Sequence, residues 1–487
     1  MFAIVFRYTF IFSLILLETH CATRKGTSPS FVETDASPKS LMNGMNQVCI
    51  SAKSMKGSYC KTPESIVFFD KVQDYTYQIK NRTKDRCLGL TRNTHENGIE
   101  VDFQACDASK TEQWFRIQAF ANDPEYHQIM VFSSSKCLDL KNPLWKAKTP
   151  FVQSTCLSRL SQNFLFLDRS KPTRKFPKIL WTYWDKGASA MPAFYRANVK
   201  RWEQVLNRSS SGEHWEVHVS NNIPGDPDYI GNYFQTSNIP TVETLASKIS
   251  SNEAMLSAPV VFSDFVRLEL LYAHGGVWMD ASIMLHADFR KFLEVLEVGD
   301  QLSLSSFTNY RQATQEFRYA DSIENFFMMA YPKTELLAEW RKAFRKYWDE
   351  KTPGVFVEHH PMFDGSEGMK VDISTFGNYR NYLNQHLTLK YTLAHNPRFQ
   401  KEILVLGGAQ YEDRGPFSLL NLAHNSDEHL LKLTHDQIRT MLAEMQSIQM
   451  SKFPSQFSKV IRAKITNEDF FFKHNNIFGA LNSRIAE

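Results

Sequence analysis

Three charged residues lie close together in the sequence, on either side of a double glycine: Asp264, Arg267 and Asp280. Asp264 and Arg267 are three residues apart, so on a helix they share one face. Asp280 follows the apolar run 277–279, at the carboxyl end of an expected strand, which is where open α/β sheets bind ligands. Because buried charge is costly unless it is paired or liganded, the pattern predicts a polar functional site.

The stretch 262–282 predicts the elements that position these residues: a short helix, a tight turn and a buried strand. Ser263 or Asp264 is the expected N-cap of the helix, because both side chains accept hydrogen bonds from free helix N–H groups. Apolar residues then recur at helical spacing, which predicts a helix buried on most sides. Gly275 and Gly276 are expected to end it, since glycine tolerates the left-handed conformation.

The wider surroundings predict an α/β domain from residue 178 onward. The segment 178–184 is rich in β-forming residues, and further strands are expected at 215–220, 302–307 and 326–330. Pro192 opens one expected helix, and Thr334 caps another. This alternation predicts a Rossmann-like, mostly parallel sheet with helices on both faces.

Length and charge set the broad class. A chain of 487 residues with 43% hydrophobic residues suggests two or three globular domains. The net charge is only +4, and the basic residues do not form an arm or a stripe. Nucleic acid is therefore not an expected partner.

The N-terminus predicts entry into the secretory pathway. Residues 8–17 are ten mostly apolar residues, which is the length of a signal-peptide core and shorter than a membrane span. We expect a signal peptide at 1–21, with a signal anchor as the alternative and the only expected attachment to a membrane. A polar, flexible stem is expected at 22–48.

The cysteines agree with an oxidising compartment. All seven precede residue 157, and two pairs have the same separation, which favours two equivalent disulfides and leaves a third pair. The pairs are Cys87 with Cys106, Cys137 with Cys156, and Cys49 with Cys60. Zinc binding is the alternative, but there is no Cys-x-x-Cys. With the sequons at Asn81 and Asn207, this predicts the Golgi lumen or secretion.

An internal repeat covers residues 65–168, and each copy offers about four short strands. Two Cys-Leu-x motifs and two degenerate Gln-x-Trp motifs resemble those of ricin-type lectins. The resemblance implies a β-trefoil at 49–168. Because a trefoil has three copies, the third is either absent or hidden in residues 41–74, with Cys49 and Cys60 in it.

The lectin resemblance also implies where sugar would bind. In the second copy Asp139 and Gln162 match the family's sugar-binding Asp and Gln, although Ser154 stands where an aromatic platform is usual. In the first copy Gly89 replaces the Asp and Glu112 the Gln. Gln162 is equally compatible with a purely structural role in the trefoil.

The central motif, with the strand at 178–184, resembles sugar transferases of the capsular-polysaccharide-synthesis type and related families with an Asp-x-Asp motif. Their pattern is Ser-Asp-x-x-Arg, then Gly-Gly-x-aromatic-x-Asp-x-Asp; here it begins at Ser263 and ends at Ser282. The resemblance implies a GT-A-like domain at 178–487, after a solvated basic linker at 169–177. It implies transfer of a hexose from a nucleotide sugar to a glycan or glycoconjugate acceptor, with retention of configuration.

The resemblance assigns roles to the matching residues. Asp264 and Arg267 would hold donor-sugar hydroxyls, and Trp181 or Trp184 would stack on the nucleotide base. Plain core packing is the alternative for both tryptophans, and a structural ion pair is the alternative for Asp264 with Arg267. Asp264, Arg267 and Asp280 would be the catalytic residues, and Asp280→Asn is expected to abolish turnover without lowering the melting temperature.

A divalent cation, Mn²⁺ or Mg²⁺, is the expected cofactor, because a nucleotide diphosphate leaving group carries charge to be neutralised. Its expected ligands are Asp280 and Ser282. Ser282 replaces the second acid of Asp-x-Asp, and a hydroxyl is the weaker ligand, so Asp413 or His424 could complete the site.

Two other classes of function remain open from the sequence. Ser282 slightly favours a non-catalytic carbohydrate-binding protein with a decayed transferase domain, whereas the intact Asp264, Arg267 and Asp280 oppose it. A glycosidase would need two carboxylates flanking the scissile bond, and no pair has a spacing that indicates this.

Overall fold

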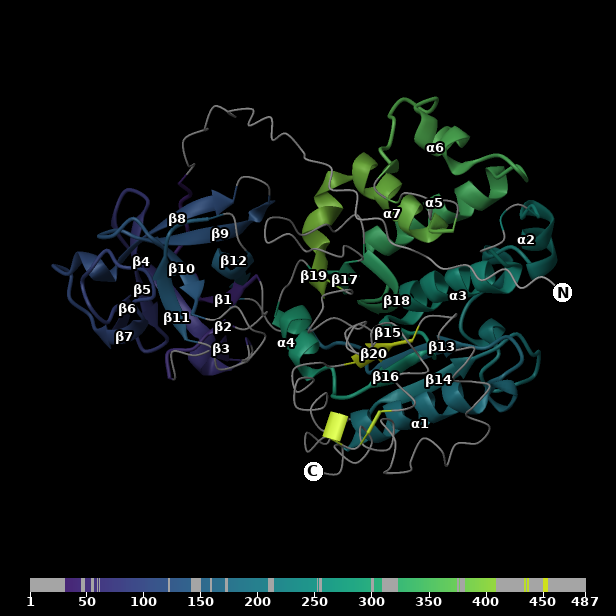
Figure 1. The fold of residues 1–487 in the computed structure, drawn as a ribbon, viewed down its shortest axis with the longest axis horizontal. Helices are drawn as coiled ribbons and strands as arrows, with labels where there is room; N and C mark the ends of the chain where they lie inside the picture. Colours follow the sequence, from purple (N-terminus) through teal and green to yellow (C-terminus); the bar gives the residue numbers. More distant parts are fainter. Residues whose placement is uncertain are drawn as a thin grey trace.

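The computed structural model describes residues 31–453, apart from several short gaps and longer ones at 142–149, 309–322, 409–432 and 438–449. The described chain forms two parts (Figure 1): an all-β part that ends near residue 168, and an α/β part that begins near residue 179. No helix among the described residues is both long enough and apolar enough to cross a bilayer.

The all-β part is a closed barrel of six strands with three hairpins. Around the barrel every strand pairs with the next, and the last pairs with the first, all antiparallel. The barrel strands are β1 (Lys39–Asn43), β4 (Ile66–Gln73), β5 (Thr76–Asn81), β8 (Trp114–Phe120), β9 (Asp123–Val131) and β12 (Asn163–Asp168). The hairpins pair β2 (Cys49–Ile50) with β3 (Gly57–Ser58), β6 (Arg86–Leu90) with β7 (Val101–Ala105), and β10 (Cys137–Leu140) with β11 (Phe151–Ser154).

Three groups of four strands, β1–β4, β5–β8 and β9–β12, therefore repeat one arrangement. The third copy that the sequence left open is β1–β4, so the all-β part is a β-trefoil. The expected stem at 22–48 is wrong for its described residues 39–43, because these form β1, which closes the barrel between β12 and β4. Leu41 and Met42 are fully buried there.

All three expected disulfides are present: Cys49–Cys60, Cys87–Cys106 and Cys137–Cys156. Each joins the first strand of a hairpin to the segment that follows the second strand, so the bridges occupy equivalent positions in the three copies. Disulfides persist in oxidising compartments, and three of them indicate an extracellular or secretory environment.

The α/β part is built on a six-stranded sheet in the order β14-β13-β15-β18-β17-β19. Five strands run parallel, and β18 alone is antiparallel to its neighbours. The strands are β13 (Ile179–Tyr183), β14 (Glu216–Ser220), β15 (Gly276–Met279), β17 (Leu304–Thr308), β18 (Ile323–Ala330) and β19 (Ile403–Gly408). The sheet is mixed, yet mostly parallel as expected.

Helices cover both faces of this sheet, as expected for this fold class. One face packs α1 (Ala193–Asn207) and α4 (Arg290–Val298) against Val277 and Met279. The other packs α3 (Ala258–His274), α5 (Glu335–Glu350) and α7 (Asn384–His395) against Trp278. Shorter helices are α2 (Val242–Lys248) and α6 (Pro361–Asp364), and β16 (Ile283–Leu285) pairs with β20 (Met450–Lys452).

Three side chains of the segment between the parts are packed, at Arg169, Arg174 and Phe176, while Ser170 and Lys175 are exposed. Arg169 donates to the Ser40 hydroxyl at 2.9 Å and to the carbonyl of Cys60. The Arg174 guanidinium lies 3.9 Å from the centre of the Tyr331 ring. Phe176 is 1% exposed. The expected solvated linker is therefore wrong for these three residues, because Arg169 packs on the all-β part and Arg174 and Phe176 pack on the α/β part.

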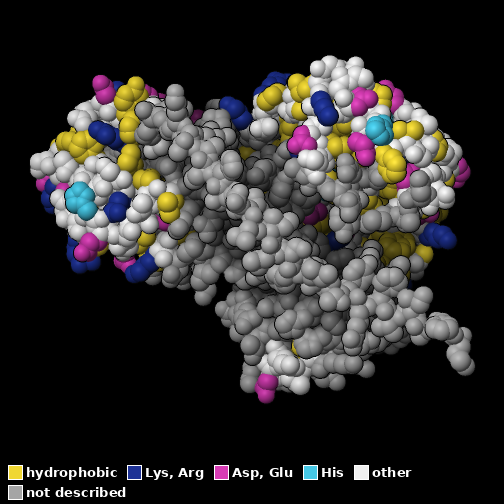
Figure 2. Space-filling view, turned by 45° about the horizontal axis from the view of Figure 1, so that its top comes forward, with side chains coloured by type: hydrophobic (Ala, Val, Ile, Leu, Met, Phe, Trp, Pro, Cys, Tyr) yellow, Lys and Arg dark blue, Asp and Glu magenta, His cyan; other side chains and the backbone are white. Residues whose placement is uncertain are grey.

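The surface in Figure 2 has no single-sign field over its described residues: Lys and Arg lie among Asp and Glu on both lobes. Apolar side chains on that face are scattered in small groups. Single exposed apolar residues are normal on globular proteins.

Candidate functional site

Helix α3 carries the first two charged residues, but it begins earlier than the sequence analysis predicted. Its N-cap is Ser257, and Pro259 lies in its first turn. The expected cap at Ser263 or Asp264 is therefore wrong, since both residues lie inside the helix. Ser257 before a proline is the ordinary signal of a helix start. Asp264 and Arg267 consequently lie on a rigid, fully formed turn.

The double glycine brings α3 and the sheet into contact. Gly275 and Gly276 have φ values of 69° and 90°, a region that side chains rarely adopt. A Cβ on Gly276 would also overlap the carbonyl oxygen of Ile179 in β13. Glycine is thus required for α3 to end and for β15 to start directly beside β13. As predicted, Asp280 follows the last residue of β15.

Arg267 is the centre of the site and is 4% exposed. Its Nη1 lies 2.8 Å from Asp264 Oδ1, and its Nη2 lies 3.2 Å from Asp280 Oδ1. The guanidinium also lies 4.7 Å from the centre of the Trp278 ring. The structure therefore brings all three predicted catalytic residues together, with one arginine bridging two carboxylates.

Lys452 completes the other side of Asp280. Its Nζ lies 2.6 Å from Asp280 Oδ2 and 2.7 Å from the Ser282 hydroxyl. Asp280 Oδ1 additionally accepts from the indole of Trp278 at 3.0 Å. Both oxygens of Asp280 thus have cationic partners. The sequence analysis missed Lys452, which lies 172 residues from Asp280.

Two amides, also missed, support the pair on α3. Gln385 in α7 accepts from Arg267 Nη1 at 2.8 Å and donates to the backbone carbonyl of Asp264 at 3.1 Å. Asn325 in β18 donates to Gln385 at 2.8 Å and to Asp264 at 3.3 Å. The Glu-Asn pair 324–325, just before the apolar run of β18, was a signal for a polar strand end. Gln385 had no comparable signal.

The two carboxylates differ in acidity. Burial raises the pKa of Asp264 to about 6, although the charge of Arg267 opposes the shift. Burial acts the same way on Asp280, but the charges of Lys452 and Arg267 outweigh it and hold the pKa of Asp280 below its usual value. Burial and then the negative charges of Asp264 and Asp280 raise the pKa of Tyr382 to about 12. Tyr382 is therefore electrostatically coupled to the site.

The tryptophans predicted to stack on a base differ in exposure. Trp181 is 2% exposed, its indole donates to the Gly275 carbonyl at 2.9 Å, and His218 stacks on it at 4.9 Å. It has no free face for a base, so its predicted role is wrong and core packing is the correct interpretation. Trp184 is only partly buried, beside Tyr195 at 5.1 Å; its role stays a prediction.

The residues expected to hold a metal do not make a good cation site in this arrangement. The Lys452 ammonium bonds both the Asp280 carboxylate and the Ser282 hydroxyl and so lies between these two expected ligands. Among the described residues, no three His, Cys, Asp or Glu side chains gather in a way that could hold a metal. Asp413 and His424 lie outside the described residues. The donor set around Ser282 therefore fits a lysine better than a divalent cation.

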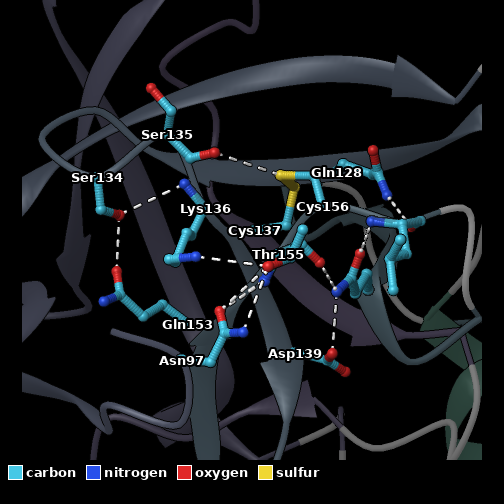
Figure 3. Close-up of a disulfide and its surroundings, with 12 residues drawn as sticks. Asn97, Gln128, Ser134, Ser135, Lys136, Cys137, Asp139, Gln153, Thr155 and Cys156 are labelled. Carbon is cyan, nitrogen blue, oxygen red and sulfur yellow. Dashed lines mark hydrogen bonds between the residues drawn. A yellow bond between two sulfur atoms is a disulfide. The ribbon is translucent and has the colours of Figure 1, made fainter. Parts of the chain in front are cut away.

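In the trefoil, Asp139 lies near the Cys137–Cys156 disulfide (Figure 3), and it is bonded to Gln162. Gln162 Nε2 donates to Asp139 Oδ2 at 2.9 Å, and Asp139 Oδ1 accepts from the backbone N–H of Leu140 at 2.8 Å. Asp139 is 6% exposed. Gln162 also bonds the backbone at Thr155 and Leu157, which is the structural role that the sequence left open.

The counterpart of Gln162 in the preceding copy is Gln113 rather than Glu112. Gln113 bonds the backbone at Ala105 and Asp107, on either side of the disulfide cysteine, as Gln162 does around its own cysteine. A Cβ on Gly89 would come within 2.8 Å of the Gln113 side chain, so Gln113 would have to shift if an Asp stood in place of Gly89.

Two family models match this chain, and their matches overlap at residues 137–154, within the trefoil. Residues 67–154 match the family model of the ricin-type beta-trefoil lectin domain-like proteins. Residues 137–360, which include Asp264, Arg267 and Asp280, match that of the capsular polysaccharide synthesis protein family. The chain thus resembles ricin-type lectins in its N-terminal part and the capsular polysaccharide synthesis family further along, in the order that the motifs predicted.

Two curated relatives are similar over part of their length. The O-glycosyltransferase PaGT of Phomopsis amygdali is 30% identical over 196 residues, which is 39% of this chain and 44% of that protein. The glycosyltransferase afumC of Aspergillus fumigatus is 27% identical over 189 residues, 38% of this chain and 44% of that protein. This chain therefore spans under half the length of these relatives. A designed three-fold symmetric protein, ThreeFoil, aligns with 27% of this chain and 98% of its own length, at a TM-score of 0.25 and 15% identity, which is too low to support an inference.

Proposed function

We propose that this protein is a glycosyltransferase that moves a hexose from a nucleotide sugar to a hydroxyl of a glycan or glycoconjugate. The observation that carries the proposal is the Asp264–Arg267–Asp280 cluster at the carboxyl end of β15. It lies in the segment that matches the capsular polysaccharide synthesis family. The names of relatives similar to this chain support the same reaction class.

In the proposed reaction the bond between C1 of the sugar and the phosphate oxygen breaks, and the electron pair leaves with the diphosphate. The acceptor hydroxyl oxygen forms the new bond to C1, and its proton passes to the departing phosphate oxygen. Retention of configuration, which the family resemblance implies, would require attack on the face that the diphosphate leaves.

The residues of the cluster take separate parts in this step. The Asp264 carboxylate would accept hydrogen bonds from donor-sugar hydroxyls, and Arg267 would hold it in place through a forked geometry that lysine cannot reproduce. Asp280 would orient the cationic groups that face the diphosphate. The positive charge that the leaving group needs has two candidate sources: a divalent cation at Asp280 and Ser282, as the sequence suggests, or Lys452.

The trefoil is proposed to serve mainly as a scaffold, because Asp139 has both of its oxygens engaged within the protein. Should it bind a glycan, it would tether the enzyme to partly glycosylated acceptor and raise the local acceptor concentration. The proposed location is the secretory pathway, in the Golgi lumen or outside the cell, with an N-terminal signal peptide or anchor.

The test is a donor panel with the purified chain. We expect slow release of nucleoside diphosphate from at least one UDP- or GDP-sugar, even without an acceptor. Absence of both turnover and calorimetric binding across the whole panel would contradict the enzyme proposal. Binding without turnover would instead favour the decayed, carbohydrate-binding alternative.

Asp280→Asn is the matched variant for this assay. We expect it to abolish turnover, because the amide cannot balance the charges of Arg267 and Lys452. The sequence suggested an unchanged melting temperature, but breaking these contacts should lower stability by about 1–3 kcal/mol. Turnover is therefore measured well below the melting temperature of the variant. Unchanged activity in the folded variant would refute the role of Asp280.

A further inference from the structure

We propose that Lys452 is the cation that faces the donor diphosphate, so that this site works without a divalent metal ion. The proposal rests on the proposed glycosyltransferase function and identifies a residue that the motif does not contain. Lys452 reaches the site on strand β20, which pairs with β16.

The position of Lys452 is fixed by backbone pairing. Strand β20 runs antiparallel to β16, with Lys452 opposite Ile283 and Met450 opposite Leu285. The next residue, Phe453, donates its N–H to the Ser282 carbonyl at 3.0 Å and is fully buried. The strand pairing and the Phe453 hydrogen bond therefore hold Lys452 beside Ile283, the first residue of β16, close to Asp280.

The ammonium lies where a metal bound by the motif would have to lie. A Mg²⁺ ligated by both Asp280 and Ser282 would be about 2.1 Å from each oxygen. The Lys452 nitrogen lies 2.6 Å and 2.7 Å from the same two oxygens. The two cations would repel and overlap, so they exclude each other. The hydroxyl of Ser282 suits this exchange because it accepts from an ammonium without adding a second negative charge.

The ammonium has capacity left for a ligand. A lysine has three N–H donors; among the described residues Asp280 and Ser282 accept two of them, and the ammonium also lies 5.1 Å from the centre of the Phe326 ring. Its side chain is 12% exposed and that of Asp280 is 28% exposed, so the pair is partly open to solvent. A phosphate oxygen is the ligand that matches a third charged donor.

During transfer, Lys452 would stabilise the negative charge that develops on the departing diphosphate. The C1–oxygen bond breaks as already described, and the lysine forms no covalent bond. The proposal thus predicts that chelators leave the reaction intact.

The experiment measures nucleoside diphosphate release by the whole chain in EDTA and in Mn²⁺, for the wild type and for Lys452→Met and Lys452→Arg. The wild type should keep its turnover in EDTA. Lys452→Met should lower kcat by about 10²–10³-fold, as removal of one preorganised donor does elsewhere. Lys452→Arg should keep part of the turnover because it retains a charged donor. Calorimetry with inorganic pyrophosphate in EDTA should show weaker binding to Lys452→Met than to the wild type.

A double variant, Lys452→Met with Ser282→Asp, recreates the two acids of the family motif. We expect it to bind Mn²⁺ by calorimetry, which the wild type should not, and to regain turnover only when Mn²⁺ is present. Lys351→Met is the stability control, since Lys351 forms another buried pair, with Glu253 at 2.8 Å, at the far end of α5. The Lys351→Met variant should be less stable than the wild type and should keep the same turnover per folded molecule.

The outcomes separate the two proposals. Wild-type turnover that EDTA abolishes and Mn²⁺ restores would overturn the role of Lys452 and leave the transferase proposal standing. Equal turnover per folded molecule for Lys452→Met and Lys351→Met would also overturn the proposed role of Lys452. If Lys452→Met does not fold, the EDTA result and Lys452→Arg decide. A chain that neither turns over nor binds any sugar nucleotide would defeat both proposals.

Discussion

At the scale of residues, one buried arginine holds two carboxylates whose acidities differ. Arg267 contacts both Asp264 and Asp280, but only Asp280 has a second cation, Lys452. Asp264 is supported by Arg267 and two amides, without a second cation. Burial therefore has the largest effect on the pKa of Asp264. The sequence was sufficient to predict the three charged residues, because their spacing is local. It could not predict Lys452 or Gln385, since each arrives on an element far along the chain.

The raised pKa of Asp264 predicts a pH dependence of stability. An acid whose pKa is raised from 3.8 to about 6 on folding binds more protons when folded, so stability falls as pH rises through this interval. Relative to Asp264→Asn, the wild type should lose about 2 kcal/mol between pH 4 and pH 7. Urea unfolding of both proteins at a series of pH values measures this difference. A difference that stays constant with pH would contradict the assignment.

At the scale of elements, the site depends on how α3 ends. Gly276 has a φ of 90° and lies against β13, so Gly276→Ala combines backbone strain with a clash. We expect it to lower the free energy of unfolding by about 2–5 kcal/mol. Gly354 is the matched control: its φ is 78°, but a Cβ there meets nothing within 4 Å, so Gly354→Ala should cost about 1–2 kcal/mol. Similar losses in denaturant midpoint for the two variants would show that contact with β13 is unimportant.

The elements also explain which expectations failed. The helix and strand of the central stretch were predictable from apolar spacing and the double glycine. The start of α3 was misplaced because Ser263 and Asp264 resemble cap residues, while the operative signal, Ser257 before Pro259, lay upstream. Strand β1 was predicted to be part of a stem, because a segment of five residues is too short to show a periodicity of its own. Pairing with β12 across the barrel makes them a strand.

At the scale of the whole molecule, the two parts share a hydrophobic core. Met42, Cys49, Cys60 and Leu167 of the trefoil belong to the same buried cluster as Phe176 and α4, and Figure 1 shows α4 beside β1–β3. Composition could suggest a linker at 169–177 but not its packing, because burial of Phe176 depends on surfaces from both parts. The trefoil is therefore held in a fixed orientation, which would fix the direction from which a tethered acceptor reaches Asp280.

This shared core predicts that the two parts unfold together. Phe176 is 1% exposed and packs edge-on against Tyr331 at 5.3 Å. Calorimetry of the wild type should show one transition, whereas Phe176→Ala, which removes about 3–5 kcal/mol of packing, should split it into two. Phe103→Ala removes an equally buried ring from the core of the trefoil alone, so it should lower the transition without dividing it. Two transitions in the wild type would mean that the parts are independent, and the fixed orientation of the trefoil would then have to be abandoned.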